Sequence, residues 1–295
     1  MAVDPFLRRQ IMGLSESVLQ AADVVDVLPT PLDRVAKVAG IAEVVNIGDL
    51  PNELVTARPK GWRRILGAYL YRAETAFVDL SQPLGRQRFI FAHETGHKIV
   101  PWHAKSFHLD NETYIFRDAN EELEEEANFA ASLLMFQGAR FHARALDYET
   151  GLQAPISLAD QYGASFHASI RFYVEHHPEP VALIVAGRLP RSDQTVPIWL
   201  SVESRTFSER FGTFRSLMPD RGVPLAPGPA HPIGTLALAA YNGSDVATEK
   251  IKLTDLADDA VTCNIETFFN QHCLFIMAST RSVLRRGRRI TVHAS

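Results

Sequence analysis

The sequence predicts an α+β fold in three parts, and the prediction rests on how its segments change along the chain. Helical patterns and one short strand pair occupy residues 1–150. Two short helical segments follow at 151–180, with the spacing of a helix-turn-helix. From residue 181 the chain turns to short β-rich runs such as VALIVAG, with a Pro/Gly-rich loop at 219–234 between them. We therefore expect domain boundaries near residues 150 and 180, with a β-rich α+β part at 181–295.

The composition fits a globular protein and argues against secreted, membrane and disulfide-rich proteins. The chain has 295 residues, of which 46% are hydrophobic. Charged residues interrupt the first 20 positions, and no apolar run could span a bilayer, so we expect neither a signal peptide nor a membrane segment. Cys263 and Cys273 imply no disulfide framework, and we expect a cytoplasmic protein. These cysteines and His272 lack the spacing of a metal site, so core packing is the expected role.

The elements of the first part follow in chain order. The segment LDRVAKVAGIAEVVNI, from Leu32, has apolar residues at helical spacing, and Gly40 loosens its end. ILGAYLYRAETAFVDLS, residues 65–81, indicates two strands around a polar turn at 72–75. Next comes RFIFAHETGHKIVPWH, residues 88–103, whose apolar lead-in indicates a further helix.

That helix contains the pattern HExxH. Positions i and i+4 share one helix face, so His93 and His97 can aim their imidazoles at a single point, as two ligands of zinc do. Glu94 is rotated by about 100° from His93, so it would approach a metal-bound water and not the metal. Gly96 inside a helix costs about 1 kcal/mol relative to alanine, which suggests that another element packs close there. The alternative is a pair of ordinary helix histidines, one solvated and one hydrogen-bonded in the core.

Two positions compete to supply a third ligand, and His103 is the first. It lies ten residues after His93, the spacing of HExxHxxGxxH. Val100 stands where that pattern has glycine, and a β-branched residue resists the positive φ of a sharp turn. The pattern therefore weakens the case for His103.

The second position lies on the helix predicted in DANEELEEEANFAASLLMF, which opens with a capping box at Asp118 and Glu121. Glu124 precedes a small, mostly apolar stripe that can lie against the first helix: Ala127, Asn128, Ala131 and Met135. Spacing alone does not choose Glu124 over Glu125. Carboxylates in the first turns of a helix are favoured by its dipole and usually face water, so we expect the other glutamates to be solvated.

Together these segments resemble a known family. RFIFAHETGH, then EEEANFAASLLM, then SLADQYGASFHASIRFYVE occur in the order found in the ImmA/IrrE metallo-endopeptidases, over about residues 30–180. The resemblance implies a zincin-like metallopeptidase domain at 1–150 that binds one Zn²⁺ per chain. It implies His93, His97 and Glu124 as metal ligands and Glu94 as the catalytic general base.

The match departs from the family pattern in the second motif. Phe129 follows Asn128 directly, and Phe136 replaces the usual closing proline, which leaves Glu125 as a rival ligand. Some members of the family carry a third domain similar to GAF sensor folds. The length and β-rich character of residues 181–295 are compatible with such a domain.

The resemblance also implies a function. It predicts a site-specific endopeptidase that cleaves a transcriptional repressor and so derepresses genes, in a stress response or in the induction of a mobile element. Glu94 would take a proton from the attacking water. We expect an extended peptide to dock along the strand edge at residues 76–80. The candidates for an oxyanion donor are Tyr69, Tyr71, His103, His108 and Tyr114.

Charge argues against direct DNA binding. The net charge of −4 gives no overall attraction to nucleic acid, and the would-be recognition helix HASIRFYVEHH has Arg171 as its one permanent cation and carries Glu175. We expect the C-terminal arginines to line a solvated turn and strand edge: Arg281, Arg285, Arg286, Arg288 and Arg289. The alternative functions are a non-proteolytic regulator or adaptor with a structural or inactive metal site, and a DNA-binding regulator. Glu94 argues against the first, because a structural site needs no such carboxylate.

Overall fold

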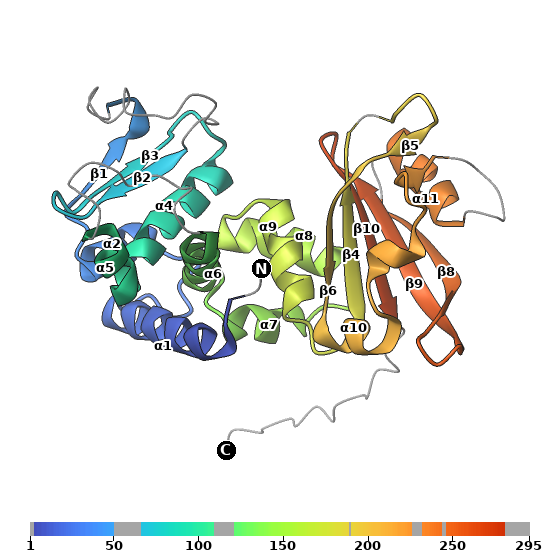
Figure 1. The fold of residues 1–295 in the computed structure, drawn as a ribbon, viewed down its shortest axis with the longest axis horizontal. Helices are drawn as coiled ribbons and strands as arrows, with labels where there is room; N and C mark the ends of the chain where they lie inside the picture. Colours follow the sequence, from blue (N-terminus) through green and yellow to red (C-terminus); the bar gives the residue numbers. More distant parts are fainter. Residues whose placement is uncertain are drawn as a thin grey trace, which may run out of the picture. The chain divides into compact units, whose positions relative to one another are not determined.

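The computed structural model describes residues 3–49, 66–108, 121–188, 190–225, 232–243 and 246–280, without the side chains of 105–108. The described chain is mixed α+β, as the sequence predicts (Figure 1). It forms two compact units. The N-terminal unit comprises Met1–Tyr148 and Ala154–Phe172, and the C-terminal unit comprises Glu149–Gln153 and Tyr173–Ser295. The boundaries near residues 150 and 180 stay a prediction.

Helices make up most of the N-terminal unit. Asp4 caps the first of them by accepting hydrogen bonds from the backbone N–H groups of Phe6 and Leu7. Gly40 ends the second in the left-handed conformation, at φ 85°. The helices are α1 (Pro5–Ala21), α2 (Leu32–Ala39), α4 (Leu84–Ile99), α5 (Pro101–His108), α6 (Glu121–Phe136), α7 (Ala139–Ala145), α8 (Gln153–Tyr162) and most of α9 (Phe166–Glu175). The predicted pair of short helices is thus present as α8 and α9, joined at Gly163 with φ 59°.

A small sheet in this unit has the order β1-β3-β2. Its strands are β1 (Glu43–Asn46), β2 (Gly67–Leu70) and β3 (Thr75–Val78), and a short 3-10 turn (Ile47–Asp49) follows β1. β3 pairs with β1 in parallel and with β2 in antiparallel orientation. The prediction of a free strand edge at residues 76–80 is therefore wrong, because the central strand has its backbone groups paired on both sides. Among the described strands, β2 has β3 as its one neighbour.

Helices α4 and α6 lie side by side and approach closely at Gly96 (Figure 1). A Cβ atom at Gly96 would lie 2.9 Å from the carbonyl oxygen of Ala127 and 3.1 Å from the Cβ of Ala130. Ala127, Ala130 and Ala131 are fully buried. The prediction that another element packs against Gly96 is confirmed, and the small residues of α6 are what permit the approach.

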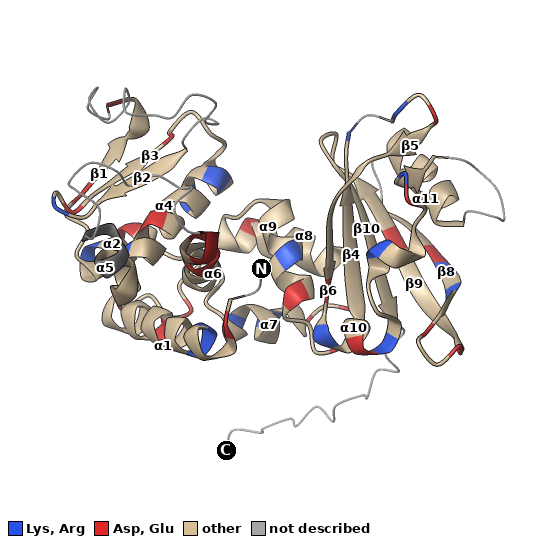
Figure 2. Ribbon diagram, in the orientation of Figure 1, with Lys and Arg blue, Asp and Glu red and all other residues tan. Residues whose placement is uncertain are grey.

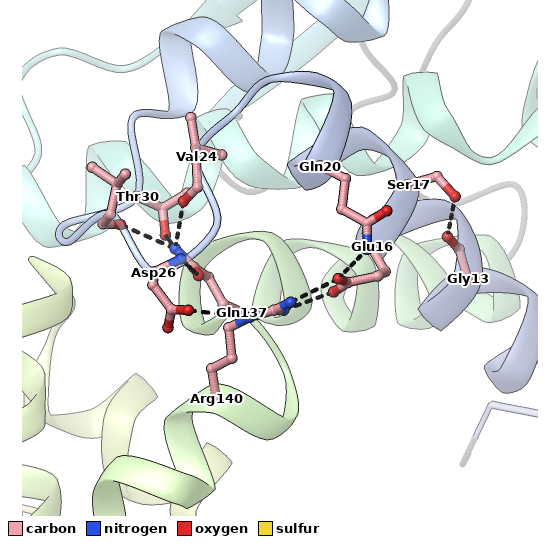
Figure 3. Close-up of polar contacts among 10 residues, drawn as sticks. Gly13, Glu16, Ser17, Gln20, Val24, Asp26, Thr30, Gln137 and Arg140 are labelled. Carbon is pink, nitrogen blue, oxygen red and sulfur yellow. Dashed lines mark hydrogen bonds and ion pairs between the residues drawn. The ribbon is translucent and has the colours of Figure 1, made fainter. Parts of the chain in front are cut away.

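Polar contacts hold the C-terminal end of α6 to the connection between α1 and α2 (Figure 3). The buried side-chain amide of Gln137 lies 3.2 Å from the carbonyl oxygen of Val24 and 3.0 Å from that of Val27. Arg140 donates two hydrogen bonds to the carboxylate of Glu16, at 2.7 and 2.8 Å. These contacts position the helix whose other end carries Glu124.

The C-terminal unit is built on an antiparallel sheet with the order β6-β4-β10-β9-β8 (Figure 1). Its elements are β4 (Val181–Ala186), β5 (Thr195–Val196), β6 (Ile198–Glu203), α10 (Arg205–Phe211), a 3-10 helix (Phe214–Leu217), β7 (Val223–Pro224), α11 (Pro232–Asn242), β8 (Ala247–Thr254), β9 (Ala260–Phe269) and β10 (Leu274–Thr280). One apolar core includes residues of the sheet, α10 and α11. Cys263 is buried in this core, as predicted. The prediction of a loop throughout 219–234 is wrong, since β7 and the start of α11 fall within it.

Several predictions concern residues outside those described. They are the helix-capping role of Asp118 and the solvated cluster of C-terminal arginines at 281–289. The likeness of residues 181–295 to a GAF fold also stays a prediction. No helix in the described part of the chain combines the length and the apolar character needed to cross a membrane.

Candidate metal centre

Helix α4 places His93 and His97 one turn apart, as the HExxH spacing predicts. Both side chains are buried, and their Nε2 atoms lie 3.1 Å apart. The two rings meet edge to face, with centroids 4.7 Å apart. The imidazoles therefore direct one nitrogen each toward a common point, and ordinary solvated helix histidines do not account for this arrangement.

Helix α6 brings Glu124 to the same point from its acidic first turns, which are coloured red in Figure 2. One carboxylate oxygen lies 3.3 Å from Nε2 of His93, and the other lies 3.3 Å from Nε2 of His97. Glu125 is not a member of this group of donor atoms. The packing of α6 on α4 thus selects the residue that spacing alone left open.

The donor atoms have the spacing that zinc requires. A tetrahedral zinc ion with bonds of about 2.0–2.1 Å has ligand atoms roughly 3.3 Å from one another. The three separations here are 3.1, 3.3 and 3.3 Å. Two imidazoles and a carboxylate are also ligands that zinc accepts. The residues present therefore fit a zinc ion.

The electrostatics of Glu124 suit the same role. Burial by itself raises the pKa of this carboxyl group, but the hydrogen bonds with His93 and His97 outweigh burial and hold the pKa well below its usual range. The carboxylate is therefore ionised at neutral pH, which is the form that binds a metal.

Glu94 lies on the side of α4 that faces the small sheet. Its side chain is buried, and a Cβ atom at Gly67 of β2 would collide with its Oε1 atom and with Ile90. A glycine at this position of β2 is thus what makes room for the carboxylate. Glu94 is not one of the three clustered donors, and its role as the general base stays a prediction.

His103 occupies a different position from either of its predicted roles. Val100 has extended backbone angles, φ −90° and ψ 103°, and the chain turns there into α5 without a positive φ. This turn brings His103 behind His97, where the two Nδ1 atoms lie 3.0 Å apart. His103 therefore contacts the cluster through His97 and does not join it. Burial lowers the pKa of His103 to about 3, so its imidazole is neutral.

Two polar partners of the histidines were not predicted from the sequence. Glu126 is 5% exposed and lies 3.0 Å from Nε2 of His103, so the expectation that it faces water is wrong. Asn128 places its Oδ1 atom 3.0 Å from Nδ1 of His93. The contact of Asn128 could have been predicted from the small-residue stripe of α6, which puts Asn128 on the face toward α4. Nothing in the spacing indicated the contact of Glu126.

The candidates for an oxyanion donor are mostly engaged elsewhere. The hydroxyl of Tyr71 donates to the backbone carbonyl of His97 at 2.8 Å, and His103 is held between His97 and Glu126. These contacts argue against both residues as oxyanion donors. Tyr69 is fully buried, whereas the side chain of His108 and the whole of Tyr114 lie outside the described residues.

A comparison with protein families assigns this region. Residues 52–171 match the family model peptidase M78, described as the IrrE N-terminal-like domain. Residues 52–171 therefore resemble an M78 domain. The matched range contains His93, Glu94, His97 and Glu124, and it ends within α9. The match confirms the resemblance to the ImmA/IrrE family and, at the level of the family, supports a regulatory metallopeptidase.

A solved structure supports the fold more widely. A Mycobacterium tuberculosis transcriptional regulator matches with a TM-score of 0.52 and 14% sequence identity, over 92% of this chain and 74% of that chain. At this identity the likeness concerns the fold alone, and it extends beyond the M78 domain. A comparison with curated proteins gave no match.

Proposed function

We propose that the protein is a zinc-dependent, site-specific endopeptidase that cleaves a transcriptional repressor and thereby derepresses genes in a stress response or during induction of a mobile element. The observation that carries the proposal is the cluster formed by His93, His97 and Glu124, with donor atoms 3.1–3.3 Å apart in an M78 domain. Glu94, which follows His93 in the HExxH pattern, favours a hydrolytic site over a structural one.

The proposed chemistry assigns one role to each residue. His93, His97 and Glu124 hold one Zn²⁺ and leave a coordination position open. When bound, zinc supplies Lewis acidity that activates water and polarises the scissile carbonyl. Glu94 accepts the proton of the attacking water and passes it to the leaving amine, a role that suits a carboxylate held apart from the metal ligands.

We place the substrate along β2 instead of the strand first expected. Gly67 of β2 lies against Glu94, so an extended peptide that pairs with the side of this strand away from β3 would pass the proposed general base. Backbone hydrogen bonds would supply affinity, and side-chain pockets would supply selectivity. A flexible segment of a repressor is a substrate of this kind.

The other parts of the chain have proposed roles as well. We assign the catalytic domain to residues 1–150, the helix-turn-helix-like segment to 151–180 and a sensor-like domain to 181–295. Direct DNA binding is not part of the proposal, because Arg171 is the one Lys or Arg in α9.

The test is the zinc content of purified wild type beside three variants. Wild type and Glu94→Gln are expected to hold about one zinc per chain, while Glu124→Gln loses it. Glu125→Gln is the matched control, because it removes the neighbouring carboxylate of the same helix and should keep the metal. Loss of zinc from Glu125→Gln alone, or no zinc in wild type, would contradict the assignment.

A second measurement tests cleavage. Purified repressors are incubated with zinc-loaded wild type and with Glu94→Gln, which keeps the metal and lacks the base. The proposal expects cleavage at one site by wild type and a loss of about 10²–10⁴-fold in the variant. Zinc binding without cleavage of any repressor would favour the non-proteolytic regulator.

A further inference from the structure

A chain of buried polar groups leads away from the proposed metal site. The Nδ1 atom of His97 faces Nδ1 of His103 at 3.0 Å, and Nε2 of His103 faces a carboxylate oxygen of Glu126 at 3.0 Å. His103 is 0% exposed and Glu126 is 5% exposed. Trp102 donates its indole N–H to the same oxygen of Glu126. The proposed function uses neither His103 nor Glu126.

The direction of these hydrogen bonds can be worked out from Trp102. An indole N–H can only donate, so the oxygen of Glu126 acts as an acceptor there. The same carboxylate oxygen lies 3.0 Å from Nε2 of His103 and can accept its N–H, which leaves Nδ1 of that ring to accept a hydrogen bond. Two facing nitrogens at 3.0 Å need one proton between them, so Nδ1 of His97 must donate it.

The consequence falls on the other nitrogen of His97. Without metal, Nε2 of His97 hydrogen-bonds the carboxylate of Glu124. When zinc replaces that hydrogen bond, a proton kept on Nδ1 leaves Nε2 with the lone pair that coordinates. The reverse order of protons would place a hydrogen on Nε2 and block coordination. His93 receives the same help from a different group, since its Nδ1 faces Oδ1 of Asn128.

We propose that Glu126 and His103 are positioning residues that hold His97 in the tautomer able to bind the metal. The proposal rests on the zinc site put forward above and adds two residues to it. They come from α5 and α6, and Trp102 keeps the carboxylate in place. Partners of this kind, which hydrogen-bond the second nitrogen of a ligating histidine, typically change metal affinity by about 10–100-fold when removed.

The first measurement reads the tautomer in the zinc-loaded protein. Two-bond ¹H–¹⁵N correlation spectra of histidine-labelled protein distinguish a protonated Nδ1 from a protonated Nε2. The ring of His103 is expected to carry its proton on Nε2 and to leave Nδ1 as the acceptor for Nδ1–H of His97. A proton on Nδ1 of His103 would overturn the proposal.

The second measurement is the zinc dissociation constant from competition with a chelator. His103→Leu removes the acceptor for Nδ1–H of His97 and should weaken zinc binding by about 10–100-fold. His103→Gln can still offer an acceptor and should recover part of the loss. Thr30→Val is the matched control, since it removes two buried hydrogen bonds at the end of α6 far from Glu124, one to the carbonyl of Met135 and one from the amide of Gln137, and should leave zinc affinity unchanged.

The outcomes separate this proposal from the function on which it rests. If wild type binds zinc and a folded His103→Leu binds it equally well, the positioning role is refuted while the metal site stands. If wild type holds no zinc, the proposed function fails and the positioning role fails with it. Should His103→Leu fail to fold, Glu126→Gln replaces it, with about tenfold weaker zinc binding expected and unchanged affinity refuting the role.

Discussion

The close approach of α4 and α6 predicts the effect of adding a single methyl group at Gly96. In Gly96→Ala the new Cβ would lie 2.9 Å from the carbonyl oxygen of Ala127, where ordinary contact begins at 3.4 Å. The difference means that α6 must move away from α4 by about 0.5 Å, because a backbone atom cannot rotate aside. His93 and His97 lie close to this position on α4, and Glu124 lies one turn from Ala127 on α6, so the movement separates the three proposed metal ligands.

Two effects on stability oppose each other. Alanine favours the helix over glycine by about 1 kcal/mol, whereas overpacking a tight interior costs about 1–3 kcal/mol. The free energy of unfolding should therefore fall by at most about 2 kcal/mol. Zinc affinity should fall as well, because metal sites tolerate errors of only about 0.2 Å in ligand position. We expect about a tenfold or greater increase in the zinc dissociation constant, which corresponds to about 1.4 kcal/mol.

The assay pairs chelator competition with thermal unfolding of the zinc-free protein. Gly13→Ala is the control, because Gly13 lies in α1 and a Cβ atom there would meet no neighbouring element within 4 Å among the described residues. That change should stabilise the protein by about 1 kcal/mol and leave zinc binding as in wild type. If Gly96→Ala behaves in the same way as Gly13→Ala, close packing of α4 and α6 does not control the metal site.

Three further predictions follow from other contacts. Gly67→Ala should retain zinc but lose cleavage by about tenfold or more, since its Cβ displaces the carboxylate of Glu94; full activity in a cleavage assay would contradict this. Gln137→Leu should lower the free energy of unfolding in urea by about 3 kcal/mol, because buried backbone groups of the α1–α2 connection lose their partner; a loss under about 1 kcal/mol would mean that water replaces the amide. The hydrogen bonds from Arg140 hold the pKa of Glu16 below its usual range, so Glu16 contributes stability above its unfolded pKa that is lost as pH falls through the native value. Glu16→Gln should therefore cost about 0.5–1 kcal/mol at pH 7 and nothing in strong acid, and a cost independent of pH would exclude the ion pair as its cause.

The local patterns of the sequence predicted the elements that carry the site. His93 and His97 share a face because the helical repeat fixes the relation of residues four apart. The strand pair at β2 and β3, the end of α2 near Gly40 and the α8–α9 pair were equally predictable, since each depends on residues within one short segment.

Contacts between distant segments were not predictable in this way. β3 is a central strand because β1, which comes earlier in the chain, joins it in parallel, and no pattern within residues 65–81 indicates that partner. His103 and Glu126 are 23 positions apart, and the sequence predicts a rival metal ligand or oxyanion donor for the first and a solvated carboxylate for the second. Their contact depends on where α5 and α6 lie. Such pairings depend on the packing of whole elements.

The sequence by itself determined that His93 and His97 share one face of a helix that also contains Glu94. It also determined that an acidic helix with a small-residue face follows and that Gly96 marks a close approach. Only the tertiary structure decided that Glu124 and not Glu125 faces the histidines. Adjacent helix residues differ by about 100° around the axis, so the choice depends on the rotation of α6. That rotation is set by the packing of Ala127 and Ala130 on Gly96, a contact that no single helix contains.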